Sequence, residues 1–357
     1  MIGHHGVTEG SIMAGNAAFR FSFGPWNIHE GADVFGPVVR KPVAKAKKIA
    51  LAKSLGFEAI QFHDDDVVES VDVPHDQMIR EAKEMKKTLD GEGLIAEFVA
   101  PRLWEHPMTV DGGYTSNDPK AREYALERSK KAIDIARTIG TRAIVLWPAR
   151  EGVYVNESKD HVAASERFVS SVNMMLEYDK EIRILGEMKP NEPMDHAYLP
   201  TIGHALAIAY QSVDPQRVGG LIETAHALLA GLDPSDEMAF ALSHNKLWSV
   251  HLNDQNGLKF DQDKSFGTAN LRGAYNQVRV LELGGYPATG RFVGLDVKAM
   301  RTQKAANAHR HLTNSRAIFL ELVDKVRSFP KKVEQQCLAN QDYEALEFEV
   351  LKHLMGK

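Results

Sequence analysis

The chain has 357 residues, of which 43% are hydrophobic and 25% charged, with a formal net charge of −5 and a pI near 6.3. This composition is typical of a globular protein with a sizeable core. The negative charge argues against nucleic acid as a partner, because such binding needs a basic face, and no stretch approaches the roughly 18 apolar residues of a membrane span.

The beginning of the chain and its cysteine content bear on the cellular compartment. Residues 1–18 contain no basic segment followed by an apolar one, so we expect a flexible leader there and not a secretory signal. Cys337 is the sole cysteine, which excludes an internal disulfide. We therefore expect a reducing, cytoplasmic compartment.

Short apolar runs alternate with longer amphipathic stretches along the chain. The runs cover residues 19–24, 57–62, 94–100, 142–147, 182–187, 218–223, 247–252 and 291–296. Between them, stretches such as 41–56 and 121–140 carry apolar residues at three- and four-residue spacing and end in glycine, as helices do. Before the second of these, Asn117 or Asp118 followed by Pro119 is a helix-start signal.

Eight strand-then-helix units without a linker predict an α/β fold, a (β/α)8 TIM barrel, over residues 19–300. Residues 301–357 are expected to form the last barrel helix and a short helical C-terminal arm. A doubly wound open sheet is the structural rival. No glycine fingerprint follows the first strand, so a dinucleotide-binding fold is not supported.

Polar and aromatic side chains follow nearly all of the expected strands. They are Trp26, His63, Asp66, Trp104, Trp147, Glu187, Lys189, Glu223, His226, His251, Asp261, Asp263 and Asp296. All fall at the carboxyl ends of strands, the face on which barrels of this kind build their sites. The sequence therefore predicts one site at the mouth of the barrel.

The carboxylates of this set favour bound metal. Like charges packed together raise one another's pKa or require a cation, and a divalent ion meets that need. Glu223 and His226, with Asp261 and Asp263, could hold a second ion, with Glu223 bridging the two. Oxygen ligands with one or two imidazoles suit Mg, Mn or Co better than a structural zinc ion.

Several motifs in the same order resemble one known family. They include "FSFGPW", "FHDDD", "EHPMTVDGGYTSND", "KPNEP" and "LNDQNGLKFDQD". From about residue 19 onward the chain is similar to the xylose isomerases of the short, actinobacterial type. The resemblance implies interconversion of aldoses and ketoses, with two divalent cations and a hydride shift between C1 and C2.

The resemblance also implies roles for the metal ligands and catalytic groups. The sugar-binding metal would be held by Glu187, Glu223 and Asp296, and the mobile metal by Glu223, His226, Asp261 and Asp263. Catalytic roles would fall to three further residues. His63, oriented by Asp66, would open the sugar ring by general acid–base catalysis. Lys189 would donate to the carbonyl oxygen at C1, and in a metal-free form we expect it to pair with Glu187 or Glu223.

The implied pocket is aromatic and shared between subunits. Trp26 and Trp147 would wall the sugar site. Phe35 matches a phenylalanine that reaches into a neighbouring subunit's pocket, so we expect a homo-oligomer, either a dimer or a tetramer. The expected ligand is a small-molecule sugar, with neither nucleic acid nor membrane as a partner.

Three departures from the family's pattern stand out. His251 occupies the position of an aspartate metal ligand. In the pocket, Ala100 and Arg102 replace small polar residues, and Trp104 replaces a phenylalanine. Arg102 could recognise an acid group of the substrate or pair with a nearby carboxylate. The segment before the terminal helix is also shorter, which reduces the arm that embraces a neighbouring subunit.

His251 changes the expected chemistry of the first metal. A nitrogen ligand tilts preference toward Mn or Co over Mg. It also adds competition from protons, because histidine titrates near ~6.5 and aspartate near ~3.9. The resulting set of Glu187, Glu223, His251 and Asp296 resembles that of the ketose 3-epimerases, which bind one metal with two Glu, one Asp and one His. In that branch, Glu187 and Asp296 would be bases acting through an enediolate.

Three functions remain open at this point. The leading hypothesis is an aldose–ketose isomerase with two metals. The alternative enzyme is a ketose epimerase, or a keto-sugar or cyclitol isomerase, that works through an enediolate. A third possibility is a metal- and sugar-binding barrel with little turnover. An endonuclease of the same superfamily is disfavoured, because such sites are richer in histidine and such proteins carry a basic face.

Overall fold

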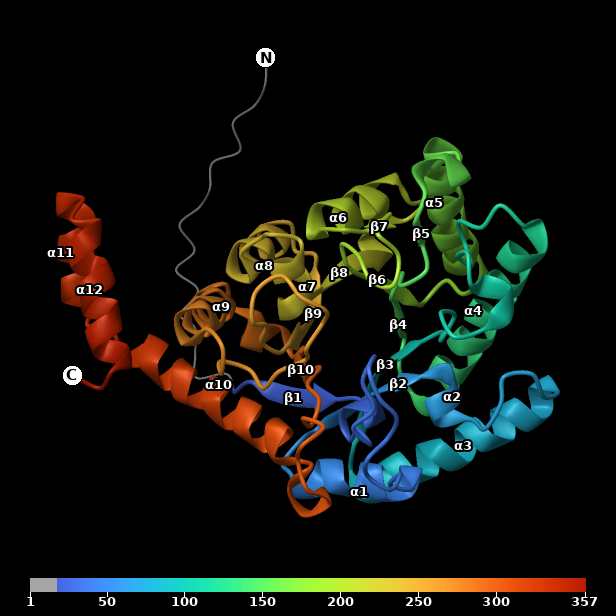
Figure 1. The fold of residues 1–357 in the computed structure, drawn as a ribbon, viewed down its shortest axis with the longest axis horizontal. Coiled ribbons are helices and arrows are strands. Elements are labelled where there is room, and N and C mark those ends of the chain that lie inside the picture. The colour runs from blue at the N-terminus through green and yellow to red at the C-terminus, as the bar shows by residue number, and fades with distance from the viewer. Residues whose placement is uncertain (1–17) are drawn as a thin grey trace.

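Over residues 18–357, which this computed structural model describes, eight parallel strands close into a barrel in the order β1-β10-β9-β8-β6-β4-β3-β2 (Figure 1). The strands are β1 (Arg20–Phe23), β2 (Ala59–His63), β3 (Ile95–Ala100), β4 (Ala143–Leu146), β6 (Arg183–Glu187), β8 (Val218–Glu223), β9 (Leu247–Leu252) and β10 (Phe292–Leu295). Each coincides with a predicted apolar run, so the expected barrel is confirmed. The leader expected over residues 1–18 lies outside this range except for its last residue.

The helices form an outer ring around the strands (Figure 1). They are α1 (Lys45–Ser54), α3 (His75–Glu92), α4 (Pro119–Ile139), α5 (His161–Tyr178), α6 (Ile202–Gln211), α8 (Pro234–Ser243), α9 (Leu271–Leu283) and α10 (Arg310–Ser328). Their ends follow the sequence signals. Asp118 caps α4 by accepting from the Lys120 amide at 2.9 Å, and Gly140 ends it at φ 94°.

Two short helices begin directly where strands end, and they place side chains at the barrel mouth. They are α2 (Asp64–Val67), after β2, and α7 (Thr224–Leu229), after β8. A small antiparallel pair, β5 (Gly152–Val153) with β7 (His196–Ala197), joins the loops that follow β4 and β6. A Cβ at Gly152 would lie 2.2 Å from the His196 carbonyl oxygen, so the pairing requires glycine there. Two-residue strands are too short to leave a periodic signal in the sequence.

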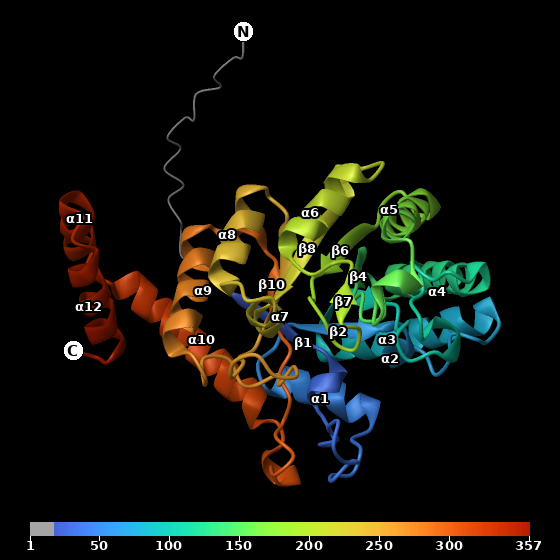
Figure 2. The same ribbon diagram turned by 45° about the horizontal axis from the view of Figure 1, so that its top comes forward.

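The C-terminal segment extends away from the barrel beyond α10 (Figures 1 and 2). It consists of α11 (Lys331–Asn340), which carries the buried Cys337, and α12 (Tyr343–Leu354). Lys325 of α10 donates to the His353 carbonyl at 2.7 Å, which ties α12 back to the barrel helix. Within residues 18–357, no helix combines the length and apolar character that crossing a bilayer would need.

Beneath the mouth, one layer of the barrel interior is apolar. A cluster separate from the main core contains Phe98, Ala100, Val145, Leu185 and Leu221, all buried. The Phe98 ring lies 5.8 Å from that of His251, measured between centroids. The polar groups of the mouth are therefore backed by a low-dielectric layer, in which charges interact more strongly than in water.

A buried ion pair anchors the short helix α2 to helix α4. Asp64 is fully buried and accepts from Arg128 Nε at 2.7 Å and from Nη2 at 2.9 Å. Paired hydrogen bonds of this kind hold a carboxylate in one orientation. Asp64 also starts α2, so this pair fixes the position of the neighbouring His63.

Asp64→Ala is expected to lower the free energy of unfolding by about 3–5 kcal/mol, because it leaves the Arg128 charge buried without its partner. Urea unfolding measures the change. As a control, Glu127→Ala breaks only the exposed Lys130–Glu127 pair and should cost less than about 1 kcal/mol. Equal effects of the two substitutions would contradict the anchoring role.

Candidate metal centre

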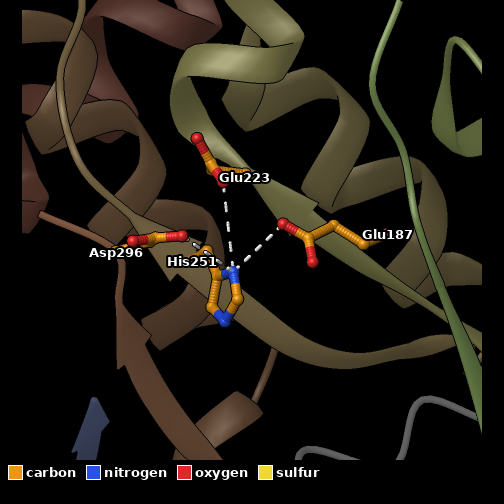
Figure 3. A group of neighbouring side chains, drawn as sticks. All are labelled: Glu187, Glu223, His251 and Asp296. Carbon is orange, nitrogen blue, oxygen red and sulfur yellow. Dashed lines mark hydrogen bonds and ion pairs between the residues drawn. The ribbon is translucent and has the colours of Figure 1, made fainter. Parts of the chain in front are cut away.

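Four side chains converge at the carboxyl ends of neighbouring strands (Figure 3). Glu187 ends β6, Glu223 ends β8, His251 is the second-last residue of β9, and Asp296 follows β10. One ligand atom from each lies within 4.8 Å of all the others. This set, hereafter the four-residue centre, is the one expected for the first metal.

In the four-residue centre, three carboxylates surround one nitrogen atom, Nδ1 of His251. His251 Nδ1 lies 3.1 Å from a Glu187 oxygen, 4.0 Å from a Glu223 oxygen and 3.9 Å from an Asp296 oxygen. Figure 3 shows the three carboxylates reaching this nitrogen from different sides. Ligands that share one ion at about 2.1 Å lie roughly 3–4 Å apart, so the residues fit a divalent cation.

The electrostatics of the four-residue centre favour binding of a cation. Burial would lower the pKa of His251, but the charge and hydrogen bond of Glu187, helped by Asp296, raise it to about 9. Burial would raise the pKa of Glu187, and the His251 charge brings it below its usual value. Burial, with the charges of Asp261 and Asp296, raises the pKa of Glu223 well above its ordinary range. The imidazolium therefore neutralises only part of the cluster.

A second cluster shares Glu223 with the first. His226 Nε2 lies 3.3 Å from a Glu223 oxygen and 3.1 Å from Asp261 Oδ2. One ligand atom of each of these three residues lies within 4.8 Å of the other two. Within residues 18–357, His226 Nδ1 and Asp261 Oδ1 are buried and have no hydrogen-bond partner. Buried polar atoms without partners are costly, and an ion would satisfy the Asp261 oxygen. This cluster also fits a metal.

Asp263, the fourth residue expected at the second metal, is paired differently. Its carboxylate accepts from Lys298 Nζ and from Asn253 Nδ2, the latter at 3.2 Å. Burial and the charge of Asp261 raise the pKa of Asp263 to about 8, against the opposing effect of Lys298. The structure therefore places Asp263 beside the second cluster and not within it.

Lys189 lies beside the second cluster and lines the cavity at the barrel mouth. Its ammonium is 3.0 Å from Asp261 Oδ2 and 3.5 Å from a Glu192 oxygen. The expected pairing with Glu187 or Glu223 is thus wrong. The cause is a long-range contact: the Asp261 amide donates to the Glu192 carboxylate at 3.1 Å and holds the two loops together. Burial would lower the pKa of Lys189, but Asp261 and Glu223 raise it, so the lysine stays charged.

The His63–Asp66 pair forms as expected, but with a competitor. His63 Nδ1 lies 3.0 Å from Asp66 Oδ2, and Asp66 also accepts from the His63 amide at 2.9 Å. Burial opposes ionisation of Asp66, yet the bonds and charge of His63 lower its pKa to about 2. Arg102 Nη2 lies 2.6 Å from the same Nδ1. A guanidinium only donates, so a ring that accepts from Arg102 there cannot also donate to Asp66.

Arg102 is surrounded by acids. Its Nε lies 2.8 Å from Asp65, its Nη1 3.2 Å from Glu105 and its Nη2 3.6 Å from Asp66. Burial would lower the pKa of Arg102, but Asp65 and Asp66 raise it. Of the two roles left open by the sequence, these contacts favour pairing with nearby carboxylates over recognition of an acidic substrate.

A cavity of ≈ 480 Å³ opens over both clusters at the barrel mouth. Trp26, Trp104 and Trp147 line it, with the rings of Trp104 and Trp147 perpendicular at 4.5 Å. The Trp26 indole donates to Asp296 at 2.9 Å, which couples an aromatic wall to the four-residue centre. Phe35 is 85% exposed and is not among the lining residues. Its reach into a neighbouring subunit stays a prediction.

Two polar residues that the sequence reasoning passed over contact these clusters. Asn253 donates to Glu223 at 2.8 Å, and Gln61 Oε1 lies 3.1 Å from His251 Nε2. Gln61 carried a usable signal. It is a polar residue inside the apolar run 57–62, two positions before His63, and alternate strand residues share a face.

Comparison with known proteins places the chain in a family. A sequence profile described as the xylose isomerase-like TIM barrel matches residues 49–311. The chain belongs to this family. Membership confirms the broad part of the expected resemblance. The narrower assignment to short, actinobacterial xylose isomerases stays a prediction.

Solved structures with the same fold include sugar epimerases. A D-psicose 3-epimerase in the presence of D-fructose is 13% identical with a TM-score of 0.63, and covers 85% of this chain and 99% of its own. A D-psicose 3-epimerase from Clostridium cellulolyticum H10 with D-tagatose is 15% identical with a TM-score of 0.60, covering 86% and 98%. A xylose isomerase domain protein from Alicyclobacillus acidocaldarius subsp. acidocaldarius is 12% identical with a TM-score of 0.60, covering 87% and 100%. At these identities the likeness shows the fold alone.

Binding of Mn²⁺ is expected to strengthen as pH rises, because the ion must displace a proton from His251. With a pKa of about 9, the metal-free ring is protonated at neutral pH. This proton alone should make the affinity rise by about tenfold per pH unit up to pH 9, and the raised pKa of Glu223 adds to the slope. The same proton stabilises the metal-free fold below pH 6.5, and that contribution is lost as pH rises to 9. Isothermal titration calorimetry across this window measures the slope.

His251→Asp is the matched variant for this titration. An aspartate binds its proton more weakly than the ring does, since its ordinary pKa is near ~3.9. The slope should therefore become shallower, and metal preference should move toward Mg²⁺. An equally steep slope and an unchanged metal preference would show that His251 does not bind the ion.

Proposed function

We propose that the protein is a divalent-metal-dependent enzyme that epimerises or isomerises a keto-sugar by proton transfer through an enediolate. The observation that carries the proposal is the placement of Glu187 and Asp296. Their carboxylates lie on opposite sides of His251 Nδ1 in the four-residue centre, which forms one wall of the cavity (Figure 3). A sugar held over that centre would have one carboxylate on each face.

The residues of the centre suit proton transfer. The lowered pKa of Glu187, which the His251 charge causes against the effect of burial, keeps this carboxylate ionised as a base must be. It would take the proton from the carbon beside the carbonyl, leaving the electron pair in the enediolate. Asp296, protonated from solvent, would deliver its proton to the other face and so invert that carbon, and exchange with solvent would then reset both carboxyl groups. A bound cation would supply Lewis-acid polarisation of the sugar oxygens.

The cavity walls support the same proposal. The three tryptophans that line the cavity would help to keep water from the reacting carbons, which would limit side reactions of the intermediate. Lys189 remains charged beside the second cluster and could donate to a developing oxyanion. Two of the solved structures with this fold are D-psicose 3-epimerases, one with D-fructose and one with D-tagatose, which supports a ketose as the substrate.

A second candidate function rests on the second cluster. Glu223, His226 and Asp261 could hold another ion beside Lys189. That arrangement supports an aldose–ketose isomerase with two metals, in which hydride moves between C1 and C2. Under this alternative, His63 and Asp66 would open the ring despite the contact of His63 with Arg102.

Isotope exchange separates these routes. The protein is incubated with Mn²⁺ and a panel of aldoses and ketoses in D2O, and the products are examined by NMR. We expect conversion with solvent deuterium at the carbon that lost its proton. Conversion without deuterium would instead support the hydride shift. No conversion, with binding of Mn²⁺ and of a polyol intact, would identify a binding protein with little turnover.

His226→Asn tests the same choice from the protein side, because it removes a ligand of the second cluster only. If proton transfer at the four-residue centre is the reaction, most of kcat should remain. If a second metal is required, kcat should fall by roughly 10²-fold or more, which corresponds to several kcal/mol of lost Lewis-acid stabilisation. His226→Asn activity in that low range would overturn the single-metal route.

A further inference from the structure

A buried hydrogen-bond network lies below His251, inside the barrel. Glu97 of β3 accepts from Ser249 Oγ of β9 at 2.7 Å, from Gln61 Nε2 of β2 at 3.1 Å, and from Ser22 Oγ of β1. Ser22, Gln61 and Ser249 are at most 1% exposed. A carboxylate is rare at such a place and requires several donors, which this network supplies. Side chains from three other strands thus donate to one carboxylate of β3, which does not itself reach the metal ligands of the cavity.

Glu97 determines which way the Gln61 amide points. A carboxylate accepts only, so the Gln61 NH2 group must face it, and the same nitrogen lies 3.1 Å from Ser22 Oγ. The opposite orientation would set the amide oxygen against the carboxylate. Gln61 Oε1 is therefore turned toward His251 Nε2, at 3.1 Å.

The amide orientation in turn determines the tautomer of His251. An amide oxygen accepts only, so the ring must carry a hydrogen on Nε2. In the neutral ring the lone pair then lies on Nδ1, the nitrogen that faces Glu187, Glu223 and Asp296. The nitrogen of a metal-binding histidine is commonly selected by the hydrogen bond that the other nitrogen makes.

We propose that Glu97 is a positioning residue that acts through Gln61 to hold His251 in the Nε2–H tautomer, so that Nδ1 is free to bind the cation. The inference rests on the metal of the proposed function but not on its sugar chemistry. Without Glu97 the amide would rotate freely, and an amide NH2 group facing Nε2 would stabilise the tautomer with a hydrogen on Nδ1. That tautomer presents a hydrogen where the ion must lie.

A double-mutant cycle that measures metal affinity tests whether Glu97 acts on His251 through Gln61. Glu97→Gln keeps the shape but lets the Gln61 amide turn, and Gln61→Met keeps the length but removes the acceptor. Each should weaken Mn²⁺ binding, measured by calorimetry, by about 10- to 100-fold. Because Glu97 acts only through Gln61, the double variant should bind no more weakly than Gln61→Met alone. Additive losses would overturn the proposal.

Tyr114→Phe is the matched control for loss of a buried hydrogen bond. The Tyr114 hydroxyl is buried and shares a hydrogen bond of 2.6 Å with Ser129 Oγ, away from Glu97, Gln61 and His251. Its removal should leave Mn²⁺ affinity within about threefold, since sites without shared partners act independently. A loss as large as that of Glu97→Gln would show that general loosening of the barrel is enough to weaken the site.

The tautomer itself is read by ¹⁵N NMR of histidine-labelled protein loaded with diamagnetic Zn²⁺, with His251→Gln to assign the signal. We expect a protonated Nε2 and a metal-bound Nδ1. Metal on Nε2 would refute the inference. Failure of the wild-type protein to bind any metal would refute the proposed function itself. Tight wild-type binding that Glu97→Gln does not alter would refute only the role of Glu97.

Discussion

The structure depends on how the barrel accommodates carboxylates that it has crowded together. Glu187, Glu223 and Asp296 from the barrel strands meet Asp261 and Asp263 from one loop, against an apolar layer. In this low-dielectric setting their repulsion is strong. Lys189 and Lys298 each neutralise one loop carboxylate, and the His251 imidazolium neutralises part of the rest. A divalent ion would complete the charge balance and would account for so many acids at one place.

The histidine among the ligands brings its own requirements. An aspartate at that position would bind the ion in one ionised form, whereas an imidazole has two nitrogens and a proton that the ion must displace. The network below the ring meets the first requirement, because Glu97 and Gln61 choose the nitrogen. The metal centre therefore reaches from the cavity into the barrel interior, and its preference for metals depends on both parts.

Much of the fold could be predicted because local sequence patterns indicate its strands and helices. Apolar runs mark the strands, and glycine-ended amphipathic stretches mark the helices. Because the carboxyl ends of barrel strands form the mouth, the sequence predicts that Glu187, Glu223, His251 and Asp296 lie together. What local patterns could not supply is the path of the loops. The loop after β9 is closed by backbone hydrogen bonds between Asp254 and Lys264, and by contacts to other loops. These contacts determine that Asp261 pairs with Lys189 and that Asp263 pairs with Lys298.

We propose that a single divalent cation lies among Glu187, Glu223, His251 and Asp296, bound by Nδ1 of the histidine. Anomalous diffraction at the manganese edge, from crystals grown with Mn²⁺, would locate this ion. We expect a strong anomalous peak at about 2.0–2.3 Å from Nδ1 and from one oxygen of each carboxylate. A peak bound through Nε2, a peak only at the Glu223–His226–Asp261 cluster, or no peak at the four-residue centre would contradict it.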